Sequence, residues 1–171
     1  MSGHSKWSQI KHKKGITDKK RSQIFSKLSR LITLAARNGS DPKSNMELSR
    51  AVEHARSFNM PNENIERAIK KVSDKNQAQL EELSIEAIGP GGIALKIKAI
   101  TDNRNRTLSE IKKILSDFEA KMVQPGSIQW MFDQLPVSVK DPVLQDRIGQ
   151  LFEALDEQDE VDGIISNTDN E

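Results

Sequence analysis

The chain has 171 residues, of which 35% are hydrophobic and 30% charged, with no cysteine and a formal net charge of +1. This composition is ordinary for a soluble fold of one domain or two small ones, and no stretch approaches the roughly 20 apolar residues of a membrane-spanning helix. The absence of cysteine excludes disulfides, thiolate metal sites and a cysteine nucleophile. Because the first residues lack the apolar region of a secretory signal, we expect a cytoplasmic protein.

The near-zero net charge conceals a strong polarity along the chain. Residues 1–40 hold ten Lys or Arg and one acid, whereas residues 132–171 hold two basic residues and eleven acids. A cationic end of this size favours a polyanionic partner such as nucleic acid. Three alternatives stay open: a solvated charged face, an acidic protein partner, and docking of the basic end onto the acidic end of the same chain.

Residues 1–16 show no helical periodicity and repel themselves electrostatically, so we expect a flexible basic arm. In the arm and the helix that follows it, basic side chains surround one aromatic ring, a combination that suits a polyanion carrying bases. The candidate nucleic-acid-binding residues of this region are Lys6, Trp7, Lys11, His12, Lys13, Lys14, Lys19, Lys20 and Arg21.

A three-helix domain is predicted over residues 17–76. Apolar residues recur on one helical face from Thr17 to Asn38, and again over about 46–58. A third helix begins near Pro61, and its spacing predicts that Ile65, Ile69 and Val72 are buried. The polar segment 73–82 then lacks any apolar period, which indicates a domain boundary.

An α+β domain is predicted over residues 80–171. Strands at 84–88 and 93–101 flank a Gly-Pro-Gly-Gly turn at 89–92, and a capping box at 107–110 starts a helix. We predict two more strands at 127–132 and 135–139, a helix after Asp141-Pro142, and a last strand at 161–165. The order ββαββαβ is typical of a mainly antiparallel sheet with both helices on one face.

Two arginines crowd the predicted junction between the second strand and its helix. Arg104 and Arg106 lie in the segment 101–107 (TDNRNRT), where a helix N-terminus already favours anions, so they could clamp a phosphate. The alternative is that Asp102 and Asn103 satisfy turn amides while the arginines pair with nearby carboxylates. The pattern alone does not decide between the two.

No motif in the chain requires an enzyme or a cofactor. The three histidines (4, 12 and 54) lack metal-ligand spacing, and the glycine turn at 89–92 lacks the Lys-Ser/Thr of a phosphate-binding loop. Asp159 and Glu160 stand in a polar run that favours solvated surface. We therefore expect a protein without catalytic activity, metal, cofactor or small-molecule substrate.

Several segments together resemble the YebC family of bacterial and organellar regulators. They are GHSKW at 3–7, IKHKK at 10–14, NMP at 59–61 with IERAIK at 65–70, GPGG at 89–92 and TDNRNRT at 101–107. The resemblance runs from the first residue to about Phe132 and resumes near Pro136. It implies that full-length relatives carry a further α+β domain inserted near residues 133–135, which this chain lacks.

The resemblance also implies two functions that need a polyanion-binding end. One is a DNA-binding transcriptional regulator, and the other acts on the ribosome, where it activates translation and relieves stalling at proline-rich stretches. A Lys-rich arm with one Trp suits irregular rRNA, whereas no helix carries the Arg/Asn/Gln cluster of a sequence-specific DNA reader. We therefore favour rRNA or the ribosome over DNA, with a charge-polarised protein adaptor as a further alternative.

Overall fold

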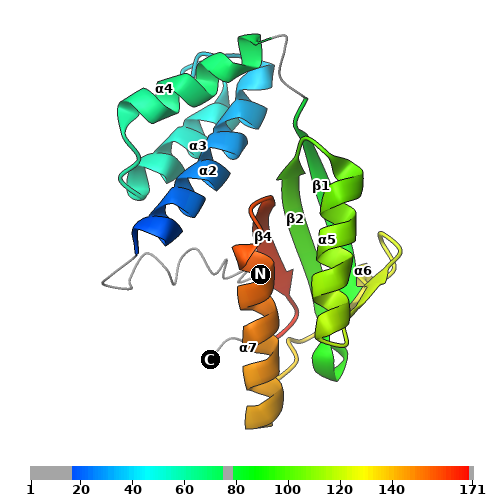
Figure 1. The fold of residues 1–171 in the computed structure, drawn as a ribbon. Coiled ribbons are helices and arrows are strands. Elements are labelled where there is room, and N and C mark those ends of the chain that lie inside the picture. Colours follow the sequence, from blue (N-terminus) through cyan, green and yellow to red (C-terminus); the bar gives the residue numbers. More distant parts are fainter. Residues whose placement is uncertain (1–16, 75–78, 170–171) are drawn as a thin grey trace. The chain divides into compact units, whose positions relative to one another are not determined.

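The computed structural model describes residues 17–74 and 79–169. The chain divides after Glu81 into two compact units, a helical unit and an α+β unit (Figure 1). The predicted arm at residues 1–16 lies outside the described residues.

Three helices form the helical unit, as the periodicity predicts. Helix α2 (Asp18–Ala35) continues into the 3-10 turn η1 (Ala36–Asn38), α3 spans Met46–Ser57, and α4 (Asn62–Lys70) ends in the 3-10 turn η2 (Lys71–Ser73). The predicted inward position of Val72 is wrong, because its side chain is 37% exposed. The reason is that Val72 lies in η2, where the tighter winding rotates it away from the stripe of α4.

All three helices contribute apolar side chains to the core of this unit. These buried residues are Ile24, Leu28, Ile32, Leu48, Val52, Ala55, Ile65 and Ala68. Two polar residues connect the elements around it. The Thr33 hydroxyl donates to the Ala68 carbonyl at 2.8 Å, which joins α2 to α4. The Asn45 side chain caps α3 by accepting from the Leu48 amide. It also donates to the backbone carbonyls of Ala35 and Gly39, which connects α3 to the end of α2.

The α+β unit is built on a four-stranded antiparallel sheet. Its strands are β1 (Glu81–Ile88), β2 (Ala94–Thr101), β3 (Lys121–Val123) and β4 (Val161–Ser166), in the order β3-β1-β2-β4. The turn η3 (Pro90–Gly92) connects β1 to β2 as predicted. Both Gly91 and Gly92 have positive φ, which the missing Cβ permits.

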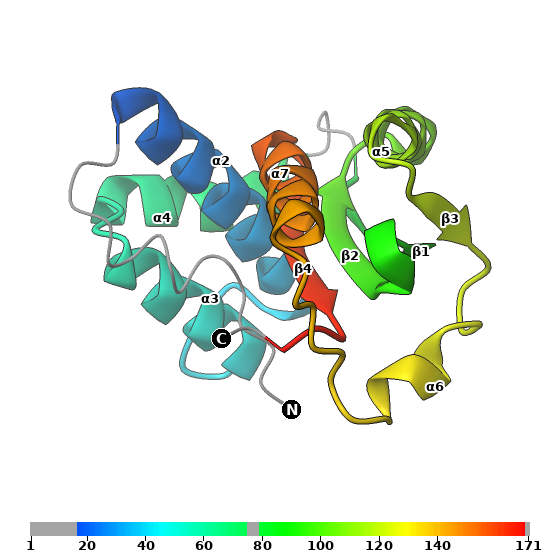
Figure 2. The same cartoon turned by 90° about the horizontal axis from the view of Figure 1, so that it is seen from below.

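Two helices cover one face of this sheet (Figure 2). Helix α5 spans Arg104–Asp117 and α7 spans Pro142–Glu157, with Asp141 capping α7 as predicted. Buried residues of both helices, such as Ile111 and Leu151, share one core with alternate residues of β1 and β2. The predicted α+β class with helices on one face is therefore confirmed.

The segment between α5 and α7 differs from the prediction. The strand expected at 127–132 is wrong: the third strand is β3, and residues 129–132 form the short helix α6 (Gln129–Phe132). The Glu86 carboxylate accepts from the backbone amides of Gly126 and Ile128, so these amides are not available to a strand ladder. The strand expected at 135–139 is wrong as well, because this segment forms only an isolated parallel bridge between Val137 and Thr168.

The capping box predicted at 107–110 is also wrong. Helix α5 begins four residues earlier, because Asn103 and not Thr107 is its cap: the Asn103 side chain accepts from the Arg106 amide. Thr107 thus lies inside the first turn, and its hydroxyl is fully buried. This placement brings Thr107 into the polar cluster described below.

Candidate nucleic-acid interface

The first turn of α2 presents three consecutive cations. Thr17 caps the helix by accepting from the Lys20 amide, so that Lys19, Lys20 and Arg21 begin the helix with exposed side chains. Arg21 pairs with Asp18 at 3.5 Å, and both side chains are mostly exposed. Exposed pairs of this kind contribute about 0–1 kcal/mol, so a phosphate can replace the carboxylate at little cost.

The two units carry opposite net charge. Within residues 17–74 there are twelve Lys or Arg and seven acids, a net charge of +5, whereas residues 79–169 hold nine basic residues and seventeen acids, a net charge of −8. A polyanion is therefore attracted to the helical unit and repelled by the α+β unit as a whole.

The other predicted residues of this interface are not placed by the structure. Lys6, Trp7, Lys11, His12, Lys13 and Lys14 all lie outside the described residues. Their role stays a prediction.

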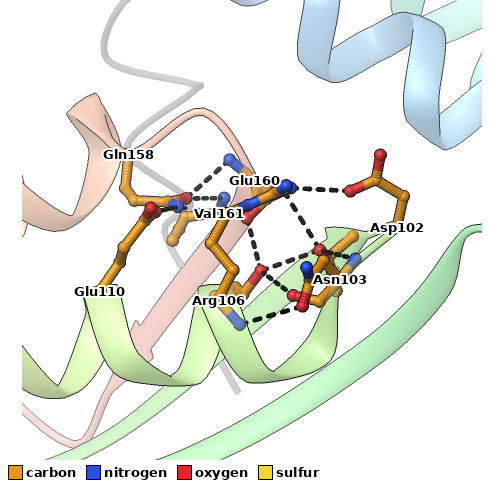
Figure 3. Close-up of polar contacts among 9 residues, drawn as sticks. Asp102, Asn103, Arg106, Glu110, Gln158, Glu160 and Val161 are labelled. Carbon is orange, nitrogen blue, oxygen red and sulfur yellow. Dashed lines mark hydrogen bonds and ion pairs between the residues drawn. The ribbon is translucent and has the colours of Figure 1, made fainter.

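Of the two arginines predicted to clamp a phosphate, Arg106 lies in the first turn of α5 and is part of a polar cluster (Figure 3). The Arg106 guanidinium donates to the Asp102 carboxylate at 2.7 Å and to the Glu160 carboxylate. The hydrogen bonds that Arg106 donates to Glu160, and then to Asp102, raise the pKa of Arg106 above its ordinary value. Arg106 is thus paired with two carboxylates, which matches the alternative that the sequence left open for it.

Glu160 is the centre of this cluster and is only 6% exposed. It accepts from the hydroxyls of Thr101 and Thr107, from Arg106, and from the Gln158 side chain at 3.3 Å. Burial alone raises the pKa of Glu160, but the hydrogen bonds from Thr107, Arg106, Gln158 and Thr101 outweigh it and lower the pKa below its ordinary value. The carboxylate is therefore held ionised.

The sequence interpretation of Glu160 as solvated surface is wrong. The residue follows α7 and precedes β4, and it joins this loop to the junction between β2 and α5. Arg104 is exposed in the first turn of α5. It follows Asn103, the cap of this helix, whose amide donates to the Thr101 hydroxyl. A polar run of acids gives no local signal that one carboxylate is buried, so only the fold identifies Glu160.

Within the described residues no group of three or more His, Asp or Glu is arranged to hold a metal ion. No helix in the same part of the chain is long and apolar enough to cross a membrane.

Comparison with known proteins identifies the family. Residues 5–75 match the family described as the TACO1/YebC protein N-terminal domain, and residues 80–146 match that described as the TACO1/YebC second and third domain. The chain belongs to the TACO1/YebC family. The family resemblance seen in the sequence is thus confirmed.

Relatives of this YebC-family chain carry the name "Probable transcriptional regulatory protein". One from Chloroflexus aurantiacus is 50% identical over 137 residues, which are 78% of this chain and 54% of the relative. Another from Trichlorobacter lovleyi is 46% identical over 156 residues, 90% of this chain and 62% of the relative. The chain thus spans about half to three-fifths of the length of these curated relatives.

A solved structure shares the fold. It is described as a conserved hypothetical protein, Aq1575, from Aquifex aeolicus, and it matches with a TM-score of 0.84 at 28% identity, over 95% of this chain and 96% of that one. This YebC-family chain therefore has an architecture already seen by experiment.

Proposed function

We propose that this chain is a non-enzymatic, nucleic-acid-binding regulator of gene expression, which binds rRNA on the ribosome and supports translation, including relief of stalling at proline-rich stretches. The observation that carries the proposal is the charge division between the units, +5 against −8, with three exposed cations at the start of α2. Phosphates are bound by Lys or Arg with release of counterions, which makes such binding strongly salt-dependent.

In this proposal the basic head is the first contact. We define the basic head as residues 1–21, whose cations contact the phosphate backbone while Trp7 stacks on a base. Arg104 and Arg106 add a second contact from the start of α5. Arg106 is already paired with Asp102 and Glu160, so a phosphate that contacts Arg106 competes with these two carboxylates.

A DNA-binding transcriptional regulator is the second candidate, and the name that the relatives carry favours it. Contacts to phosphate alone do not distinguish DNA from RNA, because they carry no sequence information. The preference for rRNA rests on the head, where cations of a Lys-rich segment surround one stacking ring instead of forming a base-reading set on one helix face.

Sedimentation of the protein with ribosomes, in gradients at low and moderate salt, tests the proposal. We expect co-migration with the large subunit at low salt and partial loss at moderate salt. Footprinting of a promoter fragment without ribosome association would favour the DNA-binding function. Absence of binding to either nucleic acid at moderate salt would contradict both and favour a protein adaptor.

A further inference from the structure

The sheet of the α+β unit has a second face, away from α5 and α7, with its own chemistry. Side chains alternate along a strand, and Leu95, Ile97 and Ala99 of β2 belong to the core under the helices. Lys96 and Lys98 therefore lie on the opposite face. By the same alternation Glu82, Ser84 and Glu86 of β1 lie there, with Leu83, Ile85 and Ala87 in the core. We call this second face the platform.

The other two strands complete the platform. In the pairing of β1 with β3, Lys121 stands opposite Ile88 and Val123 opposite Glu86, which places Lys121 on the platform. In the pairing of β2 with β4, Ile165 stands opposite Lys96. Three lysines thus gather on the platform within a unit whose net charge is −8.

Charge on the platform is favourable to an anion. Its two acids on β1 are both engaged: Glu82 pairs with Lys98 at 3.5 Å, and Glu86 accepts from the amides of Gly126 and Ile128. The Glu82–Lys98 pair is half exposed, so a phosphate can replace the carboxylate at little cost.

Helix α6 places the ring of Phe132 beside Lys96. Its position is fixed from two sides. Glu86 holds the turn before it through two backbone amides. Lys96 donates to the Gln129 side chain and lies 4.7 Å from the centre of the Phe132 ring. Because both Glu86 and Lys96 belong to the platform, α6 lies on that side of the sheet, across from α5 and α7 (Figure 2).

Trp130 is the aromatic residue of α6 that this arrangement leaves exposed. Its indole Nε1 donates to the Ser127 carbonyl at 3.1 Å, so its polar atom is already satisfied and the ring is oriented by its own turn. The side chain remains 57% exposed, an unusual state for the largest apolar residue. An exposed ring oriented by its own turn, on a short helix that Lys96 contacts, suits the stacking of an unpaired base.

We propose that the platform is a binding surface for single-stranded nucleic acid, in which a base stacks on Trp130 while Lys98 and Lys121 contact the phosphates. Lys96 acts as a positioning residue, since it holds α6 against β2. The proposal rests on the proposed function and extends it, because it adds a site that recognises unpaired bases to a basic head that contacts any phosphate backbone.

The chain contains two tryptophans, at position 7 in the basic head and at position 130 on the platform side. Replacing one of them allows ligand binding at the other site to be followed by fluorescence. In the variant Trp7→Phe, Trp130 is the only tryptophan, and its fluorescence should be quenched by a mixed-sequence single-stranded RNA of about ten nucleotides. The matched duplex should not quench it, because its bases are already stacked. Unchanged Trp130 fluorescence at saturating single-stranded RNA would overturn the proposal.

Affinity measurements with matched variants complete the test. Trp130→Ala should weaken single-stranded binding about 5- to 150-fold, Trp130→Phe should restore most of it, and both should leave duplex binding unchanged. The pair Lys98→Gln and Lys121→Gln should lower the slope of log affinity against log salt by roughly 0.7 for each lysine. The control pair Lys112→Gln and Lys113→Gln removes the same charge from exposed positions on α5 and should change the slope less.

The outcomes separate this proposal from the proposed function. If neutralising the lysines of the basic head weakens both single-stranded and duplex binding while the platform variants have no effect, the platform proposal fails and the proposed function stands. If the head variants have no effect on either ligand, the proposed function fails. If Trp130→Ala binds nucleic acid as the parent chain does but no longer binds an associated protein, the platform proposal is likewise overturned. That result would indicate a protein partner.

Discussion

Replacing Glu160 tests whether the polar cluster holds the α+β unit together. In Glu160→Ala the hydroxyls of Thr101 and Thr107, both fully buried, lose a charged acceptor. A hydrogen bond to a charged group contributes about 1.5–3 kcal/mol, and the Thr107 hydroxyl can still donate to the Asn103 carbonyl. The ion pair with Arg106 adds little to the stability, because the guanidinium is half exposed. We therefore expect a loss of about 2–4 kcal/mol in the free energy of unfolding.

Urea unfolding at pH 7, followed by Trp130 fluorescence in a Trp7→Phe background, measures this loss in the α+β unit. Glu160→Gln keeps the volume and one acceptor and should lose about half as much. Glu110 accepts from the same Gln158 side chain but is exposed, so Glu110→Gln is the matched control and should change stability by less than about 0.5 kcal/mol. A loss in Glu160→Ala no greater than that of the control would refute the reasoning.

The pH dependence of the same measurement gives an independent check. Because the pKa of Glu160 is lowered in the folded state, its contribution is fully present above the unfolded pKa of about 4.3 and is lost as the pH falls through the lower folded value. The stability difference between the parent chain and Glu160→Gln should therefore be constant from pH 7 to about 5 and shrink below that. A difference that grows towards low pH would contradict this assignment.

Three further changes have defined outcomes. Asn45→Ala removes the cap of α3 and two hydrogen bonds to buried or half-buried carbonyls, so urea unfolding of the helical unit should show a loss of about 2–3 kcal/mol. Gly91→Ala should destabilise the α+β unit more than Gly92→Ala, since both have positive φ but only the first places a Cβ 2.6 Å from Leu144; equal losses would refute that contact. Trp7→Ala should weaken binding of single-stranded RNA by about 1–3 kcal/mol in an anisotropy titration, and no loss would leave Trp7 without a stacking role.

The fold was predictable wherever a pattern repeats. The three helices of the first unit, the turn between β1 and β2, and the Asp141 cap of α7 all follow from periodicity and from glycine, proline and capping residues. Prediction failed between α5 and α7, where the run from Ser127 to Phe132 has the residue types of a strand. There the carboxylate of Glu86, about 40 positions away in the chain, takes the amides that a strand would use.

The candidate site shows the same division between local and distant causes. The cations of the basic head are visible in the sequence, because charge depends on composition alone. The sequence does not show that Arg106 pairs with Glu160 or that Glu160 is buried. The two residues are 54 positions apart, and they meet only when β4 pairs with β2. The exposure of Trp130 is likewise not visible in the sequence, because it follows from the short helix that replaced the expected strand.

The salt dependence of rRNA binding tests the central claim most directly. Affinity for a large-subunit rRNA fragment should be measured between about 50 and 200 mM salt for the parent chain, for Lys11→Ala, Lys13→Ala and Lys14→Ala combined, and for a control with Lys112, Lys113 and Lys140 changed to Ala. We predict weaker binding and a slope reduced by roughly 2 in the first variant, at about 0.7 for each phosphate contact, with a smaller change in the control. An unchanged slope in the head variant would contradict the account of the basic head as the phosphate-binding end of this protein.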